Sequence, residues 1–236
     1  MLNEFSRTQL LIGKEKMDKL KASSVIIFGV GGVGSYCVEA LARTGIGKIT
    51  LVDNDVVSLT NINRQLVALH STIGKLKVDV TKERIYDINP ECEVKVFNCF
   101  YSAENDGGIV LSDYDYIVDA IDSVKSKVSL IEQAKELDVP IISSIGAGNK
   151  LDPTKFKVTD IYKTEMCPLA KVMRRELRLK GIKKLKVVFS TEQSVEPLEP
   201  TEEKSPIKPF IPGSTAFVPS VAGLIIASEV VKDLTK

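Results

Sequence analysis

Short apolar runs recur along the first two thirds of the chain, and stretches of helical periodicity separate most of them. The run VIIF at residues 25–28 is apolar at every position, which is typical of a strand buried on both faces of a sheet. The pattern predicts strands over residues 25–28, 48–52, 94–97, 114–120 and 140–143, and helices over residues 7–20, 35–44, 72–88 and 124–137.

Strands that alternate with helices favour an α/β fold with a Rossmann-like, doubly wound and mostly parallel sheet. The pattern changes after Asp152-Pro153, where we expect a C-terminal α/β extension. We predict a single domain over residues 1–236, with an N-terminal helix, a core at about 20–150 and a C-terminal region at about 151–236. In that region we expect strands over 156–161 and 187–190, helices over 169–179 and 221–234, and a loop over 192–212.

The longest apolar stretch lies at residues 216–231. Pro219, Ser220, Ser228 and Glu229 interrupt it, and it is shorter than the ~20 apolar residues that a membrane span needs. We therefore expect a buried or dimer-facing helix and no membrane insertion.

Composition excludes several classes of mechanism. The formal net charge is +1, so no global field draws the chain to nucleic acid or membrane. His70 is the only histidine, and the four cysteines form no C-x-x-C pair, so we expect no zinc. Scattered thiols and an N-terminus unlike a signal peptide indicate a cytoplasmic protein.

A glycine-rich turn follows the first strand. Gly29, Gly31 and Gly34 satisfy the spacing G-x-G-x-x-G before a predicted helix. The first glycine permits the tight turn, the second lets a ligand approach the backbone, and the third allows close helix packing. Asp53 ends the next strand, where a carboxylate can accept hydrogen bonds from ribose hydroxyls. These features predict a nucleotide site and leave NAD and ATP open, with glycines needed for packing alone as the alternative.

The loop at residues 53–65 (DNDVVSLTNINRQ) carries more polar chemistry than a dehydrogenase usually needs. It holds Asp55, Asn61 and Arg64, and Lys77 follows just inside the next predicted helix. Arginine and lysine suit a triphosphate and a transition state that gains charge on phosphoryl oxygens. The alternatives are a surface ion pair for Arg64, a solvated side chain for Lys77 and a structural role for Asp55.

The segment DAIDS at residues 119–123 lies at the carboxyl end of another predicted strand. Open parallel sheets bind ligands at that edge. Asp122, beside Ser123, is a candidate ligand of Mg²⁺, which prefers carboxylate and phosphate oxygens. The alternative is that Asp122 caps the helix that begins near residue 124.

These motifs in this order resemble the ubiquitin-activating-like (ThiF-type) superfamily, which includes the bacterial activators of thiamin and molybdopterin sulfur carriers. The resemblance rests on GVGGVGS at 29–35, LVDNDVVSLTNINRQ at 51–65, IGKLK at 73–77 and DAIDS at 119–123. It implies an ATP-binding core and a carboxylate-adenylating enzyme. It also implies adenosine contacts at Gly31, Gly32 and Asp53, phosphate contacts at Asn61, Arg64 and Lys77, and Mg²⁺ at Asp122.

The resemblance extends to the N-terminus. Arg7, in FSRTQ, matches an arginine that in this superfamily reaches the γ-phosphate across a homodimer. We therefore expect a homodimer in which Arg7 is a further catalytic residue.

Sulfur-carrier activators usually carry two C-x-x-C pairs for zinc, which this sequence lacks. The segments SSIGAGNKLDPTKFKVTDIYKT at 143–164 and GSTAFVPSVAGLIIASEVV at 213–231 are instead similar to the tRNA threonylcarbamoyladenosine dehydratases. This likeness implies ATP-dependent cyclisation of the threonylcarbamoyl group on adenosine 37 of tRNA through an acyl-adenylate. Activation of the C-terminal carboxylate of a sulfur-carrier protein is the alternative, and a sulfur-transfer helper protein stays open as a partner.

Residues 171–186 contain eight basic residues and one acid, Glu176. Lys171, Arg174, Arg175 and Arg178 fall at helical spacings that share a face. The pattern predicts an anchor for tRNA phosphates, with a solvated basic helix as the alternative.

Cys167 precedes this basic helix and is the one candidate for a covalent thioester. The implied reaction needs no enzyme nucleophile, so we favour a small packing residue at that position. Two further function classes stay open: an NAD-binding oxidoreductase and a nucleotide-binding scaffold without catalysis.

Overall fold

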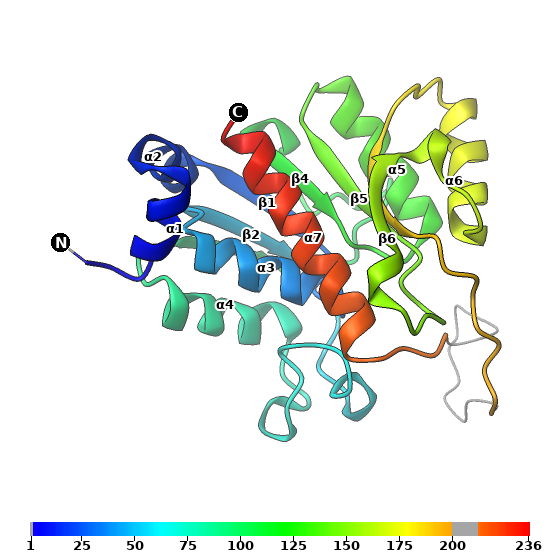
Figure 1. Ribbon diagram of the computed structural model, residues 1–236, viewed down its shortest axis with the longest axis horizontal. Coiled ribbons are helices and arrows are strands. Elements are labelled where there is room, and N and C mark those ends of the chain that lie inside the picture. Colours follow the sequence, from blue (N-terminus) through cyan, green and yellow to red (C-terminus); the bar gives the residue numbers. More distant parts are fainter. Residues whose placement is uncertain (1, 200–211) are drawn as a thin grey trace.

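The computed structural model describes residues 2–199 and 212–236, which form one seven-stranded sheet with helices on both faces (Figure 1). The strand order is β3-β2-β1-β4-β5-β7-β6, with β6 antiparallel to β7 and every other neighbouring pair parallel. The predicted α/β class and mostly parallel sheet are confirmed. The strands are β1 (Ser24–Phe28), β2 (Lys48–Val52), β3 (Glu93–Phe97), β4 (Tyr116–Asp119), β5 (Ile141–Ile145), β6 (Phe156–Asp160) and β7 (Lys186–Ser190).

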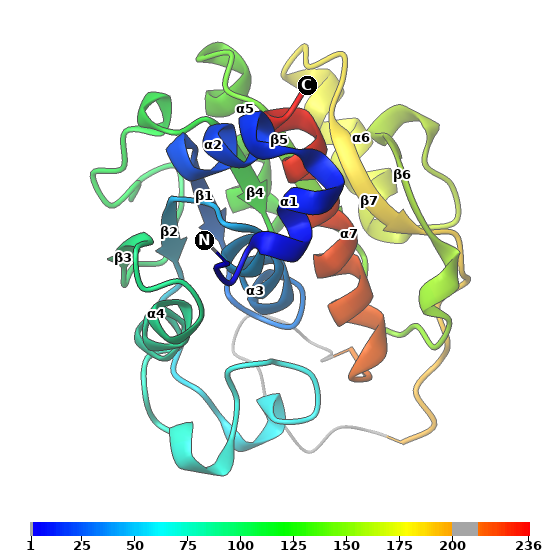
Figure 2. The ribbon, with the colours of Figure 1, turned by 60° about the vertical axis from the view of Figure 1, so that its left-hand side comes forward.

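Strand β1 shows why the central strands read as unbroken apolar runs. Its residues point alternately to two faces, and both faces are covered by helices. Val25 and Ile27 belong to one core cluster, with α2, α3, α4 and α7, while Ile26 and Phe28 belong to the other, with α5 and α6 (Figure 2). The helices are α1 (Ser6–Ile12), α2 (Lys14–Ala22), α3 (Gly34–Thr44), α4 (Lys77–Ile88), α5 (Val124–Glu136), α6 (Pro168–Leu179) and α7 (Phe217–Leu234).

Helix α7 crosses α3 at close range, since a Cβ on Gly223 would lie 2.3 Å from the carbonyl oxygen of Val33. The predicted C-terminal helix is therefore a core helix of this chain. It begins at Phe217 rather than residue 221, because a proline such as Pro219 is tolerated in a first helical turn. No helix of the described residues is long and apolar enough to cross a membrane.

The predicted bounds of two helices are wrong. The helix expected over residues 7–20 is split into α1 and α2 at Gly13, which has a φ of +82° that ends the first helix. The helix expected from residue 72 begins at Lys77, because residues 70–72 form a separate 3₁₀ turn and Gly74 takes a φ of +84°.

The C-terminal region extends the sheet of the core, since β7 pairs with β5. The division of the chain near residue 150 stays a prediction. Of the predicted loop over 192–212, residues 200–211 lie outside the described residues, and the rest contains no helix or strand.

Candidate functional site

Three loops leave the carboxyl ends of β1, β2 and β4 along one side of the sheet, which we call the carboxyl edge. The chain direction across the sheet reverses at β1, because β2 lies on one side of it and β4 on the other. Open parallel sheets bind ligands in the crevice at such a reversal. The sequence-predicted residues of the glycine turn, of the loop after β2 and of the loop after β4 all lie at this edge.

The glycines of the turn are needed for different reasons, since some avoid a clash with the protein's own backbone and one leaves open space. Gly29 has a φ of +90°, and a Cβ there would lie 2.7 Å from the carbonyl oxygen of Ala120. A Cβ on Gly34 would lie 1.8 Å from the carbonyl oxygen of Gly29. A Cβ on Gly31 would meet nothing closer than the Gln65 amide nitrogen at 3.8 Å. Packing therefore requires Gly29 and Gly34, whereas the space beside Gly31 is open to a ligand.

Asp53 joins the loop after β2 to the glycine turn. Its carboxylate accepts the backbone N–H of Val30 at 2.7 Å and that of Asp55 at 2.8 Å. Burial raises the pKa of the Asp53 carboxyl, while the charge of Lys77 and both N–H groups act in the opposite direction. A carboxylate offers about four lone-pair positions, so two bonds leave capacity for ribose hydroxyls.

Lys77 is buried at the first turn of α4, where its ammonium lies 2.7 Å from the exposed carboxylate of Asp55. The backbone N–H of Lys77 also donates to the carbonyl of Asp55 at 3.0 Å. These bonds fix a cation beside the loop after β2. The alternative of a solvated Lys77 is wrong, because only 5% of its side chain is exposed.

Arg64 and Asn61 are held by their own loop. The Arg64 guanidinium donates to the Thr60 carbonyl at 2.7 Å and to the Asn63 side chain at 3.0 Å. The Asn61 side-chain oxygen accepts the backbone N–H of Ser58 at 3.1 Å. The Arg64 carbonyl would lie 3.5 Å from a Cβ on Gly32, so this loop passes next to the glycine turn.

Ser123, not Asp122, caps helix α5. The Ser123 hydroxyl accepts the backbone N–H of Ser126 at 3.5 Å, as an N-cap side chain does. This corrects the interpretation of Asp122 as the cap. Asp122 is exposed immediately before the helix, at the carboxyl edge.

A buried ion pair beneath this loop was missed by the sequence analysis. Both oxygens of Asp119 lie 2.9 Å from the ammonium of Lys127, and neither side chain is exposed to solvent. Ser143, on β5, donates to Asp119 at 2.5 Å. The pair ties the end of β4 to the second turn of α5 and so fixes the loop that carries Asp122. Its only signal in the sequence is an aspartate at a strand end eight residues before a lysine.

Gln65 was also missed. It is buried, and its side-chain oxygen has no hydrogen-bond partner in the part of the chain that the structure describes. Its amide nitrogen faces the open space at Gly31. Buried polar atoms are seldom left unpaired, so this oxygen points to a ligand donor. The signal in the sequence is its place in the motif NINRQ, directly after Arg64.

Arg7 is not brought to this site by its own chain. It lies exposed on α1, and α1 and α2 contact the far end of α3, where Phe5 and Met17 pack around Gly45. Helix α3 alone spans about 16 Å at 1.5 Å per residue. Arg7 therefore does not reach the glycine turn of its own chain.

The basic helix α6 presents its four predicted residues unequally. Lys171 and Arg175 are exposed, and Arg175 pairs with Glu176 at 2.6 Å. Arg174 is half-buried and donates to the carbonyl of Thr164 at 2.9 Å, while Arg178 lies over the ring of Tyr162 at 5.2 Å. Arg174 therefore fixes the helix to the preceding turn.

Cys167 is buried at the start of α6. Its sulfur lies 2.7 Å from the position of a Cβ on Gly146, directly after β5. This contact agrees with the interpretation as a small packing residue.

The residues at the carboxyl edge fit a nucleoside triphosphate. The open space at Gly31, the unpaired Gln65 oxygen and the cation of Lys77 supply room, an acceptor and a positive charge. No group of three or more possible metal ligands occurs in the part of the chain that the structure describes. Mg²⁺ is usually held by one or two carboxylates together with phosphates, and Asp122 is an exposed carboxylate at this edge.

Comparison with known proteins gives consistent matches. The model of the ThiF family matches residues 5–236. A tRNA threonylcarbamoyladenosine dehydratase of Bacillus subtilis is 50% identical, covering 100% of this chain and 96% of that protein. Its Escherichia coli counterpart is 42% identical over 82% of this chain and 75% of that protein. A crystal structure of an E. coli tRNA N6-threonylcarbamoyladenosine dehydratase in complex with ATP aligns with a TM-score of 0.86 and 36% identity, covering 98% of this chain and 93% of that one.

We predict that Gly31→Ala and Gly34→Ala separate ligand space from packing. The first should leave the unfolding midpoint of the free protein unchanged and weaken ATP binding about tenfold, equal to about 1.4 kcal/mol. The second should lower the free energy of unfolding by about 1–3 kcal/mol, because its Cβ would overlap backbone. Calorimetric titration and denaturant unfolding measure both. Unchanged ATP affinity in Gly31→Ala would show that no nucleotide approaches there.

We also predict that Lys127→Met destabilises the protein by about 3–5 kcal/mol, because it leaves the Asp119 charge unpaired in the core. The double variant Asp119→Asn, Lys127→Met should recover much of this loss. Lys125→Met, on the exposed side of the same helix, is the matched control and should change stability by less than about 0.5 kcal/mol. Denaturant unfolding provides the measurement, and equal stability of Lys127→Met and the control would contradict the prediction.

Proposed function

The chain belongs to the ThiF family, and on that premise we propose that it is an ATP-dependent tRNA threonylcarbamoyladenosine dehydratase. The observation that carries the proposal is the convergence of the loops after β2 and β4 on the glycine turn. Ala120 meets Gly29, Asp53 binds Val30, Gln65 faces Gly31, and the Arg64 carbonyl lies beside Gly32. The full-length similarity to the B. subtilis dehydratase supports the choice of substrate.

The reaction that this site would perform has two steps. The carboxylate of the threonylcarbamoyl group attacks the α-phosphorus of ATP, which forms an acyl-adenylate and releases pyrophosphate. A group within the same modified nucleoside then attacks the activated carbonyl, and AMP leaves with one carboxylate oxygen. The nucleoside loses one water in total, because the proton of the attacking group is also released. Adenylation is needed because a carboxylate has no leaving group better than oxide.

The chain's own residues would divide the work on ATP. The backbone at Gly31 would admit the adenosine part, and Asp53 would accept from the ribose. An adenosine contact at Gly32 would be through its backbone alone, because a Cβ there would lie 3.1 Å from Pro219. Lys77, Arg64 and Asn61 bind the phosphates and stabilise the charge that develops as pyrophosphate leaves. Asp122 would hold Mg²⁺, which when bound neutralises phosphate charge.

A homodimer is part of the proposal. Arg7 lies far from the glycine turn of its own chain, and α1 has no buried residue. Leu10 and Leu11 on α1 are 86% and 87% exposed, which favours a second copy as their cover. In that arrangement Arg7 of each copy would complete the site of the other. A cytoplasmic location fits the four cysteines, all of which are free thiols.

The exposed face of α6 is the proposed tRNA contact. Lys171, Arg175 and Arg178 are exposed on it, whereas Arg174 is engaged with Thr164. Helix α6 begins at the carboxyl edge, where Cys167 packs against Gly146 after β5. Phosphates of the tRNA backbone bound along α6 would therefore lead toward the ATP site.

We expect the protein with ATP to remove one water from threonylcarbamoyladenosine in tRNA, as mass spectrometry of the nucleosides would show. Lys77→Ala should abolish this loss, because it removes the cation at the phosphates. Lys75→Ala, two residues earlier and exposed, is the matched control and should retain activity. Pyrophosphate release with a sulfur-carrier protein but not with tRNA would instead establish the rival function.

We further expect an equimolar mixture of two inactive variants, Arg7→Ala and Lys77→Ala, to regain roughly a quarter of the parent activity. Random exchange makes half of the dimers mixed, and each mixed dimer holds one intact site. Nucleoside mass spectrometry after subunit exchange measures the recovery. A mixture that stays inactive, although exchange is demonstrated by a labelled subunit, would exclude the contribution of Arg7 across the dimer.

A further inference from the structure

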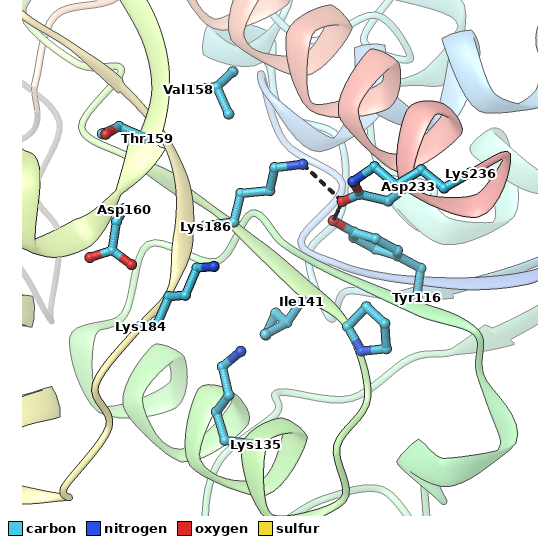
Figure 3. Close-up of a pocket in the computed structure, with 11 residues that line it drawn as sticks. Tyr116, Lys135, Ile141, Val158, Thr159, Asp160, Lys184, Lys186, Asp233 and Lys236 are labelled. Carbon is cyan, nitrogen blue, oxygen red and sulfur yellow. Dashed lines mark hydrogen bonds and ion pairs between the residues drawn. The ribbon is translucent and has the colours of Figure 1, made fainter.

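The amino edge of the sheet, opposite the ATP site, carries a groove that the proposed reaction does not use. It has a volume of about 490 Å³ and lies where β4, β5 and β7 begin and β6 ends (Figure 3). Ile141 and Val158 form part of its apolar wall. Its charged residues are four lysines and two aspartates: Lys135, Lys184, Lys186, Lys236, Asp160 and Asp233.

Two of these lysines are neutralised by carboxylates. Lys186 lies 2.8 Å from Asp233 and 2.7 Å from Glu229, and Lys236 lies 2.5 Å from Asp233. The hydroxyl of Tyr116 also donates to Asp233, at 2.8 Å. This network anchors α7 to β4 and β7, and its carboxylates already compensate the charges of these two lysines.

Lys135 and Lys184 are different. Within residues 2–199 and 212–236, neither has a carboxylate at ion-pair distance. Asp160, the acid that faces them, accepts the backbone N–H groups of Tyr162 and Leu185. Figure 3 shows both lysines extending into the same space beside Ile141, while Lys186 turns toward Asp233.

The neighbouring charge of Lys184 weakens the preference of Lys135 for its charged form. Burial is the main cause that lowers the pKa of Lys135, and the charge of Lys184 lowers it further. Asp138 and Asp160 act in the opposite direction without reversing the shift. An anion bound between the two ammonium groups would relieve this repulsion.

We propose that this groove binds a phosphate group of the tRNA backbone between Lys135 and Lys184. The proposal rests on the proposed function, because tRNA is the substrate there. Helix α6 leads from the carboxyl edge to this groove, since it starts beside Gly146 and the chain after it passes through Lys184 into β7. Its 12 residues span about 18 Å at 1.5 Å per residue. The groove thus fixes the RNA at a point remote from the reacting nucleotide.

The test is the affinity of the full-length protein for tRNA at several salt concentrations without ATP. The double variant Lys135→Gln, Lys184→Gln should bind several-fold more weakly, and the slope of log affinity against log salt should fall by about one to two. Lys135→Arg, Lys184→Arg should keep parent affinity, because the charges remain. Lys16→Gln, Lys48→Gln removes two exposed lysines elsewhere and is the matched control.

Dehydration assays distinguish a failure of RNA binding at the groove from a failure of the proposed dehydratase activity. With saturating tRNA, the Gln variant should turn over at the parent rate with a raised KM, because the ATP site is intact. Loss of RNA affinity in the Gln variant would support the groove even if the parent dehydrated no tRNA. Parent affinity and salt slope in the Gln variant would overturn the proposal. A third result would also overturn it: inorganic phosphate stabilises the parent against heat but not the Gln variant, while the Gln variant binds tRNA normally. The groove would then bind a small anion and not the RNA.

Discussion

The buried ion pair between Asp119 and Lys127 is the interaction on which the carboxyl edge depends. Neither side chain reaches solvent, so the two charges compensate each other. Asp119 also accepts hydrogen bonds from Ser143 and from the backbone N–H of Ile121. The pair fixes the turn from β4 to α5, and that turn presses Ala120 against Gly29. Displacing the pair would move Asp122 and the floor of the glycine turn together. Burial of the two charges costs desolvation free energy, and in return the turn from β4 to α5 keeps its shape without a bound ligand.

The glycine turn shows how one motif serves two purposes. Gly29 and Gly34 are required by the protein's own backbone, which leaves no room for a Cβ at either position. Gly31 has free space in front of it. The amide nitrogen of Gln65 borders that space, and the oxygen of the same amide has no hydrogen-bond partner among the described residues. Folding does not require a glycine at position 31, and a buried acceptor lies nearby without a partner. These two observations together indicate where a ligand would bind.

The two edges of the sheet have different chemistry. The carboxyl edge combines backbone amides, acids and a buried lysine around one crevice, as a site for a reacting nucleotide requires. The amino edge carries lysines on an open groove, which suits a polyanion held by charge rather than by shape. Helix α6 connects the edges, so in the proposed arrangement its basic surface would orient a long substrate whose reacting group lies at the carboxyl edge.

Local sequence determined the strands, the glycine turn and the motif residues of the carboxyl edge. An apolar run or a G-x-G-x-x-G spacing constrains the backbone within a few residues, and it does so in any context that buries it. The break at Gly13 and the start of α4 at Lys77 were not predicted, because helical periodicity continues through both positions. At Gly13 the helix ends because the glycine adopts a φ of +82°. Lys77 begins its helix where its N–H meets Asp55.

Only the tertiary structure decided which partners the polar residues take. It paired Asp119 with Lys127 and Ser143. It turned Arg174 toward Thr164. It placed the helix that carries Arg7 at the end of α3 far from the glycine turn of the same chain. It also brought Lys135 and Lys184 to one groove, although they are 49 positions apart in the sequence, with no carboxylate of the described residues at ion-pair distance from either. The reason is physical: a charged side chain is stabilised by whatever folding brings within a few ångströms, and that neighbour is set by the packing of whole elements rather than by the residues beside it in the chain.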